Sequence, residues 1–261
     1  MEITFENPGV EYMIESILAF QTEENEFWSG PLYYFFPQLD KDYADKLVFS
    51  EKKKYIEKII RQVYAEIECT LDEKINLYSK YWNEYKEQIT CALSEAFDID
   101  CASIFNDFTC YISLNPISPR FLDENRFEVF YLNSEKGALG ASLHEIIHFV
   151  WFHVWNKVFE DSYEEYERPS LKWIFSEMVV ESIMRDERLS SINPYFPREE
   201  GGCIYPYFFT LQTSDGVAID ILDKMYREKD IRTFMKEGYE WCKLHEDEIR
   251  SHIEKSEQSE L

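Results

Sequence analysis

Glycine is scarce in this sequence, and long apolar runs are missing from it. The 261 residues include only 8 glycines, against 20 phenylalanines and 18 tyrosines. That balance disfavours a turn-rich all-β fold and favours packed helices. No stretch approaches the roughly 18 uncharged apolar residues of a membrane-spanning helix. The N-terminus also lacks a basic start followed by an apolar run, so we expect no secretory signal.

The sequence has no pair of cysteines at the C-x-x-C spacing that is typical of zinc ribbons and redox motifs. Its six cysteines are scattered along the chain. In the absence of an export signal, scattered cysteines indicate reduced thiols rather than a disulfide framework. We therefore expect a cytoplasmic protein.

Basic residues are few as well. The chain has 27 Lys and Arg against 51 Asp and Glu, which gives a net charge of −24. Such a surface repels phosphate backbones and anionic lipids, so we expect neither a nucleic acid nor a membrane as a partner. Apolar residues nevertheless make up 45% of the chain, which is enough to bury a sizeable core.

The expected fold is α+β and mostly α. No proline or glycine stands between Glu51 and Asn106, and apolar residues recur there at helical spacing. This pattern predicts either one long helix or two helices with a break near Thr70 to Asp72. Two later segments, Phe108 to Leu114 and Arg126 to Leu132, are rich in the β-branched and aromatic residues that are typical of strands.

We predict that these two strands form a small antiparallel sheet ahead of a central helix. A helical region over residues 1–97 is expected to pack on a core over residues 98–261, and this division is also compatible with one single domain. The core is expected to end in a helical lobe. Its helices are predicted by apolar periodicity over Val217 to Tyr226, Ile231 to Glu237 and Gly238 to Ile253.

The central helix, expected from about Leu139 to Phe159, contains an H-E-x-x-H pattern formed by His144, Glu145 and His148. Two histidines four residues apart lie about 40° apart around a helix axis, so both imidazoles can reach one metal ion. Glu145 lies on nearly the same side and can reach a water on that ion, as a zinc hydrolase requires. Because the surrounding residues are apolar, the alternative is a buried polar patch that is satisfied by hydrogen bonds.

A hydrolytic zinc site usually has a third protein ligand. His153 lies about 140° around the helix from His148, so we expect it to pack rather than to bind metal. Glu177 and Glu181 share one face of an apolar helix that begins at Leu171. The intervening chain, with an acidic loop over residues 160–168, is long enough for this helix to return antiparallel to the first. The alternative is a solvated acidic face.

This combination of residues resembles the gluzincin metallopeptidases, which include thermolysin-like enzymes and zinc aminopeptidases. The resemblance covers about residues 108–189, and the segment Ser118-Pro-Arg-Phe-Leu122 extends it to small uncharacterised bacterial members. It implies a zincin-like fold, Zn²⁺ as the cofactor, Glu177 as the third ligand and Glu181 as a brace for a ligand histidine. The family usually has Asp at the brace and Asn before the ligand, where this chain has Glu181 and Ser176.

These patterns predict a zinc-dependent hydrolase that cleaves a peptide or protein substrate, with Glu145 as the general base. The strand from Arg126 to Leu132 is expected to pair with the extended substrate. Tyr205, Tyr207 and His245 are candidates for stabilising the oxyanion, by residue type alone. Three alternatives stay open: a catalytically silent zincin-like binding or regulatory protein, a closed structural zinc site with Glu181 as fourth ligand, and an all-helical interaction protein.

Overall fold

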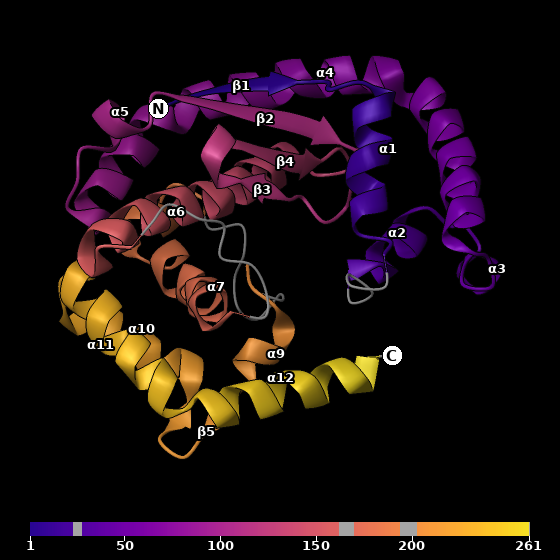
Figure 1. Cartoon of the computed structure of the whole chain (residues 1–261). Helices are drawn as coiled ribbons and strands as arrows, with labels where there is room; N and C mark the ends of the chain where they lie inside the picture. The colour runs from indigo at the N-terminus through magenta and orange to yellow at the C-terminus, as the bar shows by residue number, and fades with distance from the viewer. Residues whose placement is uncertain (23–27, 162–169, 194–202, 261) are drawn as a thin grey trace.

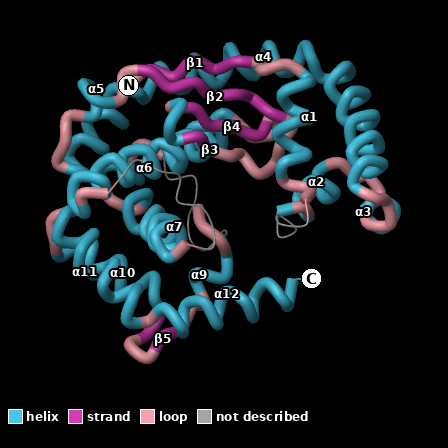
Figure 2. The backbone as a smooth tube through the Cα atoms, in the orientation of Figure 1, coloured by secondary structure: helices cyan, strands magenta, loops and turns pink. Residues whose placement is uncertain are grey.

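A computed structural model describes residues 1–22, 28–161, 170–193 and 203–260 of the chain. The protein is mostly helical with one small four-stranded sheet and a short hairpin, so the predicted α+β, mostly α class is confirmed (Figures 1 and 2). The acidic loop predicted over residues 160–168 lies almost wholly outside the described residues. Within the described ranges, no helix combines the length and apolar character needed to cross a bilayer.

The main sheet consists of β1 (Glu2–Glu6), β2 (Asp107–Ser113), β4 (Arg126–Phe130) and β3 (Arg120–Phe121), in that spatial order. The prediction of an antiparallel sheet is wrong, because β1, β2 and β4 are mutually parallel and only β3 runs antiparallel to β4. The segment between β2 and β4 contains β3 and carries the chain back along the sheet, so that β4 starts at the same end as β2.

Both predicted strands are present, β2 shifted by one residue and β4 two residues shorter than expected, but their neighbours differ from the expectation. β4 lies between β2 and β3, so it is not the free edge that was expected to pair with a substrate. The edge is β3, and the backbone carbonyl of Pro119 just before it accepts a hydrogen bond of 2.9 Å from the amide of Glu128. β1 was not predicted. Its alternating buried residues, Ile3 and Phe5, lie in a strand too short to give a distinct pattern.

Helix α4 (Phe49–Phe97) is a single element of 49 residues, so the alternative of two helices with a break near Thr70 is wrong. It runs along the sheet and packs against β1, α6 and α1 (Figure 1). Leu71, at the expected break, is fully buried. Further along, Lys74 Nζ and Tyr78 Oη donate hydrogen bonds of 2.7 and 2.6 Å to the carbonyl of Asn133, which lies just before α6.

Helices α6 (Glu135–Phe159) and α7 (Leu171–Met184) form the centre of the molecule. Helix α6 begins four residues earlier than predicted, at a cap where Ser134 Oγ accepts a 3.1 Å hydrogen bond from the amide of Gly137. Ser170 caps α7 in the same way. Almost every residue of α7 is buried, which explains why neither its sequence nor that of the middle of α6 alternates between apolar and polar faces.

The C-terminal lobe consists of α10 (Ala218–Glu228), α11 (Ile231–Leu244) and α12 (Glu246–Glu260). The predicted break at Gly238 is wrong, because this glycine lies inside α11. A Cβ atom there would stand 2.8 Å from Cζ of Phe175, so the glycine allows α11 to approach α7 closely. One contiguous apolar core includes Ile56 of α4 and Ile253 of α12, and therefore joins the two regions expected from the sequence.

Short elements complete the described fold. They are α1 (Val10–Ala19), α2 (Gly30–Phe35), α3 (Lys41–Ala44), α5 (Cys101–Ile104), η2 (Leu122–Glu124), α8 (Glu187–Ser190), α9 (Pro206–Phe209), β5 (Gln212–Thr213) and β6 (Gly216–Val217). Of these, α1 lies beside the ends of the strands and packs on α4, and α9 lies next to α12 and packs on α10 and α12 (Figure 1).

Proline at position 70 tests the continuity of α4. A proline inside a helix removes a backbone hydrogen bond and clashes with the preceding turn, at a cost of about 3 kcal/mol or more. We expect Thr70→Pro to lower the free energy of unfolding by about that amount in urea denaturation. Thr70 is exposed, so Thr70→Ala should change it by less than about 1 kcal/mol. A proline variant as stable as the parent would show that the helix is broken there.

Candidate metal centre

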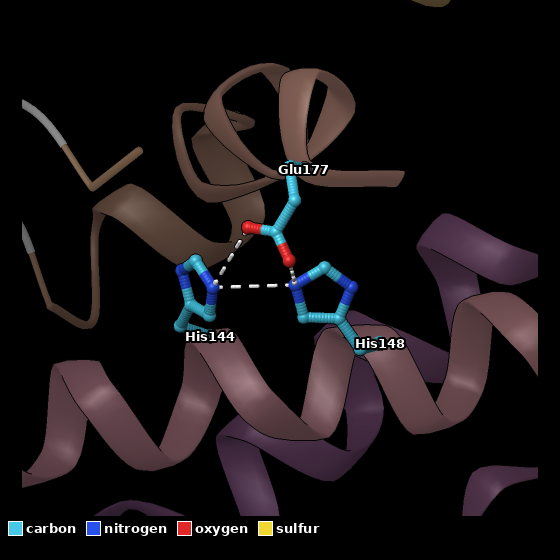
Figure 3. Close-up of side chains that lie close together, drawn as sticks. All are labelled: His144, His148 and Glu177. Atoms are coloured by element: carbon cyan, nitrogen blue, oxygen red, sulfur yellow. Dashed lines mark hydrogen bonds and ion pairs between the residues drawn. The ribbon is translucent and has the colours of Figure 1, made fainter. Parts of the chain in front are cut away.

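Three side chains from α6 and α7 converge on one point (Figure 3). The Nε2 atoms of His144 and His148 lie 3.2 Å apart. Glu177 faces both rings, with Oε2 at 3.7 Å from Nε2 of His144 and Oε1 at 3.4 Å from Nε2 of His148. The predicted convergence of His144, His148 and Glu177 is therefore present in the structure.

The distances match the requirements of a single metal ion. A tetrahedral zinc ion with ligands at about 2.0–2.1 Å separates its donor atoms by about 3.4 Å. The three observed separations, 3.2, 3.4 and 3.7 Å, lie on both sides of that value. Two imidazoles and one carboxylate form a donor set that binds first-row transition metals. The group formed by His144, His148 and Glu177 could therefore hold a metal ion.

Burial keeps the two imidazoles in the form that binds metal. Desolvation lowers the pKa of His144 to about 3 and the pKa of His148 well below its ordinary value, and the positive charge of Arg120 acts in the same direction. Both rings are therefore neutral at pH 7, with lone pairs available to a cation. Burial raises the pKa of Glu177, and Arg120 opposes that shift.

Cys203 lies between the ring of His144 and the carboxylate of Glu181. The backbone of Cys203 hydrogen-bonds to this imidazole, and the Cys203 thiol lies 3.4 Å from Oε2 of Glu181. Glu181 is buried on α7 and also approaches Arg185 at 3.6 Å. Cys203 thus links Glu181 to the candidate ligand His144. Nδ1 of His148, by contrast, makes no hydrogen bond to any residue that the structure describes.

Glu145 and Arg120 stand beside these three candidate ligands. Oε1 of Glu145 lies 4.0 Å from Nε2 of His144, and its Oε2 lies 3.5 Å from Nη1 of Arg120. The same Arg120 nitrogen lies 3.3 Å from Oε1 of Glu177. The sequence did not identify Arg120 as a site residue. It follows a proline in an irregular segment, and only the strand pairing of β3 carries it to the helices.

A cavity of about 790 Å³ lies next to this group. Its lining includes His144, Glu145 and Glu177, together with an aromatic wall formed by Trp28, Trp173 and Tyr205. Within that wall the Trp28 and Tyr205 rings are 5.6 Å apart, and the Trp173 and Tyr205 rings are 5.8 Å apart. Cavities of this size accommodate organic ligands.

The three candidates for the oxyanion donor end up in different places. Tyr205 lines the cavity, and burial raises the pKa of its hydroxyl well above the ordinary value, with a further contribution from Glu177. Tyr207 stacks on Tyr205 with ring centres 5.4 Å apart, and it does not belong to the described cavity lining. His245 lies at the end of α11, where its two nitrogens face Glu248 at 2.6 Å and Asp215 at 3.0 Å. His153 packs edge-on against Phe105, as predicted.

Metal binding can be tested with the histidines of α6. We expect chelator-treated protein to bind one zinc ion per chain and to gain about 2.7 kcal/mol of stability at a free zinc concentration of 100 times Kd. His148→Ala should abolish this gain, which thermal denaturation measures as a shift in Tm. His153→Ala, on the same helix, should preserve it. Equal zinc-dependent shifts in both variants would place the metal elsewhere.

The surroundings of His245 predict a pH-dependent stability. Partial burial lowers its pKa, but the hydrogen bonds with Glu248 and Asp215 outweigh this effect, and the folded-state pKa is raised above its ordinary value. The resulting stabilisation is complete below the unfolded pKa of about 6.5 and is lost as the pH rises through the higher folded value. In urea denaturation from pH 6 to pH 9, the parent should therefore lose more stability than His245→Gln. Parallel pH profiles would contradict this expectation.

Comparison with known proteins assigns no family or function to this chain. The chain matches no protein-family model, no curated protein and no solved structure. The description of this centre therefore rests on geometry and electrostatics: two neutral imidazoles and a carboxylate that could hold a metal ion, a second carboxylate and a guanidinium beside them, and an adjoining cavity.

Proposed function

We propose that this protein is a zinc-dependent hydrolase that cleaves peptide bonds. The observation that carries the proposal is the position of the Glu145 carboxylate beside the two imidazoles and Glu177. Three protein ligands with an open position and an adjacent base are what a hydrolytic zinc site requires. The arrangement also supports the resemblance to gluzincin metallopeptidases, including a zincin-like fold.

Zinc is the metal that this donor set favours under the proposal. Imidazole nitrogen suits zinc and its transition-metal neighbours, whereas calcium and magnesium sites are built from oxygen donors. When bound, zinc supplies Lewis-acid chemistry, since it polarises a carbonyl group and lowers the pKa of water toward about 7. His144, His148 and Glu177 are the residues that would hold it.

Glu145 is the general base of the proposed reaction. Its carboxylate accepts a proton from the attacking water while the water oxygen bonds to the carbonyl carbon and the π-electron pair moves onto the carbonyl oxygen. Glu145 then passes the proton to the leaving amine as the C–N bond breaks. Tyr205 lines the same cavity, and its hydroxyl keeps its proton at neutral pH.

The proposed substrate is a peptide or an extended segment of a protein. The residues from Ile117 to Phe121 all line the cavity as one continuous segment that ends in the edge strand β3. An extended backbone pairs naturally with such an edge, which presents its carbonyl groups at regular intervals. The aromatic wall of Trp28, Trp173 and Tyr205 offers apolar surface to a substrate side chain.

A catalytically silent binding or regulatory protein is the second candidate. A protein of that kind needs no base beside the metal ligands, so the position of Glu145 disfavours it. A closed structural site with Glu181 as fourth ligand is disfavoured as well, because the group of candidate ligands among the described residues contains His144, His148 and Glu177 but not Glu181.

The proposal predicts that a substitution of Glu145 removes the activity and keeps the bound metal. We expect the zinc-loaded parent to hydrolyse members of a mixed peptide library. Glu145→Gln should retain one zinc ion per chain and lose about 10²- to 10⁴-fold in kcat/KM, since it removes the proton acceptor and leaves the ligands in place. Mass spectrometry of the products and metal analysis measure the two quantities.

Glu135→Gln is the matched control, because it removes the same charge from the first turn of the same helix. Its kcat/KM should stay within about twofold of the parent. A parent that binds zinc but cleaves no peptide, or a Glu145→Gln variant as active as the parent, would refute the proposed hydrolase.

A further inference from the structure

The guanidinium of Arg120 lies at the centre of the proposed reaction. Nη1 is 3.5 Å from the proposed base Glu145 and 3.3 Å from the proposed ligand Glu177. The side chain is only 10% exposed, and what is exposed faces the cavity. Because an arginine is always charged in a protein, this position holds a permanent positive charge.

The backbone around Arg120 is fixed by contacts on both sides. Arg120 pairs with Phe127 of β4 in the antiparallel register, and the preceding carbonyl of Pro119 accepts the amide of Glu128 at 2.9 Å. The loop before it is tied to α1, since Nδ2 of Asn115 donates a hydrogen bond of 2.8 Å to Oγ of Ser16. The donor is therefore held in place before any substrate binds, which is what makes a hydrogen bond effective in catalysis.

We propose that Arg120 donates a hydrogen bond to the oxyanion that forms during peptide hydrolysis, an inference that rests on the proposed function. A carbonyl group that is attacked by water beside Glu145 must lie close to both Glu145 and Glu177. A guanidinium that contacts both carboxylates can reach its oxygen. Arginine has five N–H donors in a rigid fork, so one can stay on Glu177 while another meets the developing negative charge.

The position of Arg120 favours this role over the anchoring of a substrate carboxylate. An anchor acts on a part of the substrate away from the reacting bond and strengthens the ground state and the transition state equally, so its loss raises KM. A donor to the oxyanion acts only in the transition state, so its loss lowers kcat. The contacts with Glu145 and Glu177 place Arg120 at the reacting bond.

The closing experiment compares zinc-loaded parent, Arg120→Gln and Arg120→Lys in three measurements. The first is peptide hydrolysis, with kcat and KM determined separately. The second is calorimetric binding of a phosphonamidate peptide, whose tetrahedral anionic phosphorus resembles the oxyanion, alongside a cleaved product peptide. The third is zinc affinity in competition with a chelator.

For Arg120→Gln we expect kcat and phosphonamidate affinity to fall together by about 100-fold or more, with product affinity unchanged within about threefold. Arg120→Lys keeps the charge and one donor, so it should recover part of both losses. Zinc should bind Arg120→Gln at least as tightly as the parent, because a positive charge beside the cation is removed. Arg227→Gln removes an equal charge from an exposed pair with Asp223 and should match the parent in all three measurements.

Several results would overturn the assignment. They are phosphonamidate binding that is equal in parent and Arg120→Gln, a rise in KM with unchanged kcat, or a loss of zinc in both Arg120 variants. The binding measurement does not require turnover, so it separates the two proposals. If the parent binds the phosphonamidate but cleaves no peptide, and Arg120→Gln weakens that binding, the peptidase is refuted while Arg120 is still shown to donate to a tetrahedral anion at this site.

Discussion

The burial of a polar group between two apolar helices is the constraint on which this structure depends. His148 is fully buried and Glu177 is 4% exposed, while nearly all of the residues around them on α6 and α7 are apolar. Buried polar groups are costly unless they are satisfied, and a carboxylate facing two imidazole lone pairs is best satisfied by a cation. The two helices must therefore meet at these three side chains, which fixes their relative register.

The remaining elements cover the two central helices and bring the other site residues to them. Helix α4 and the sheet cover one side of α6, and α10 and α11 cover α7 and the other side of α6. The close approach of α11 at Gly238 seals the core behind α7. On the side of the sheet, β3 delivers Arg120 to the site, and α1 supports the loop that leads into it. The cavity lies where these two layers leave the helices uncovered.

The sequence alone identified the site residues whose positions follow from the regular repeat of a helix. His144 and His148 share a helix face, and Glu177 stands on a second apolar helix at a distance that allows an antiparallel return. Both inferences need only helical geometry. Helix α4 was less certain, since its sequence permits a break near Thr70, whereas the structure has one continuous helix with Leu71 buried in the core.

The features that sequence could not supply are non-local. The parallel arrangement of β2 and β4 depends on the path of the chain between them, and β1 joins the sheet from more than 100 residues away. Arg120 reaches the site because β3 pairs with β4. This pairing produces no regular pattern of apolar and polar residues that the sequence could reveal. His245 shows the opposite failure: its residue type suggested a role in the site, but two carboxylates hold it at the end of α11.

The positive charge of Arg120 opposes the binding of a cation at the site, and this conflict bears on the role of Arg120. With both imidazoles neutral, ionised Glu145 and Glu177 would carry two negative charges, of which the guanidinium beside them balances one. A divalent cation would be held more tightly if Arg120 were absent, because like charges at this depth repel strongly. A fold that served only to retain metal would gain from an apolar residue on β3. Under the proposed function the guanidinium lowers metal affinity, and the negative charge that would develop on a substrate beside it gives a reason for that cost.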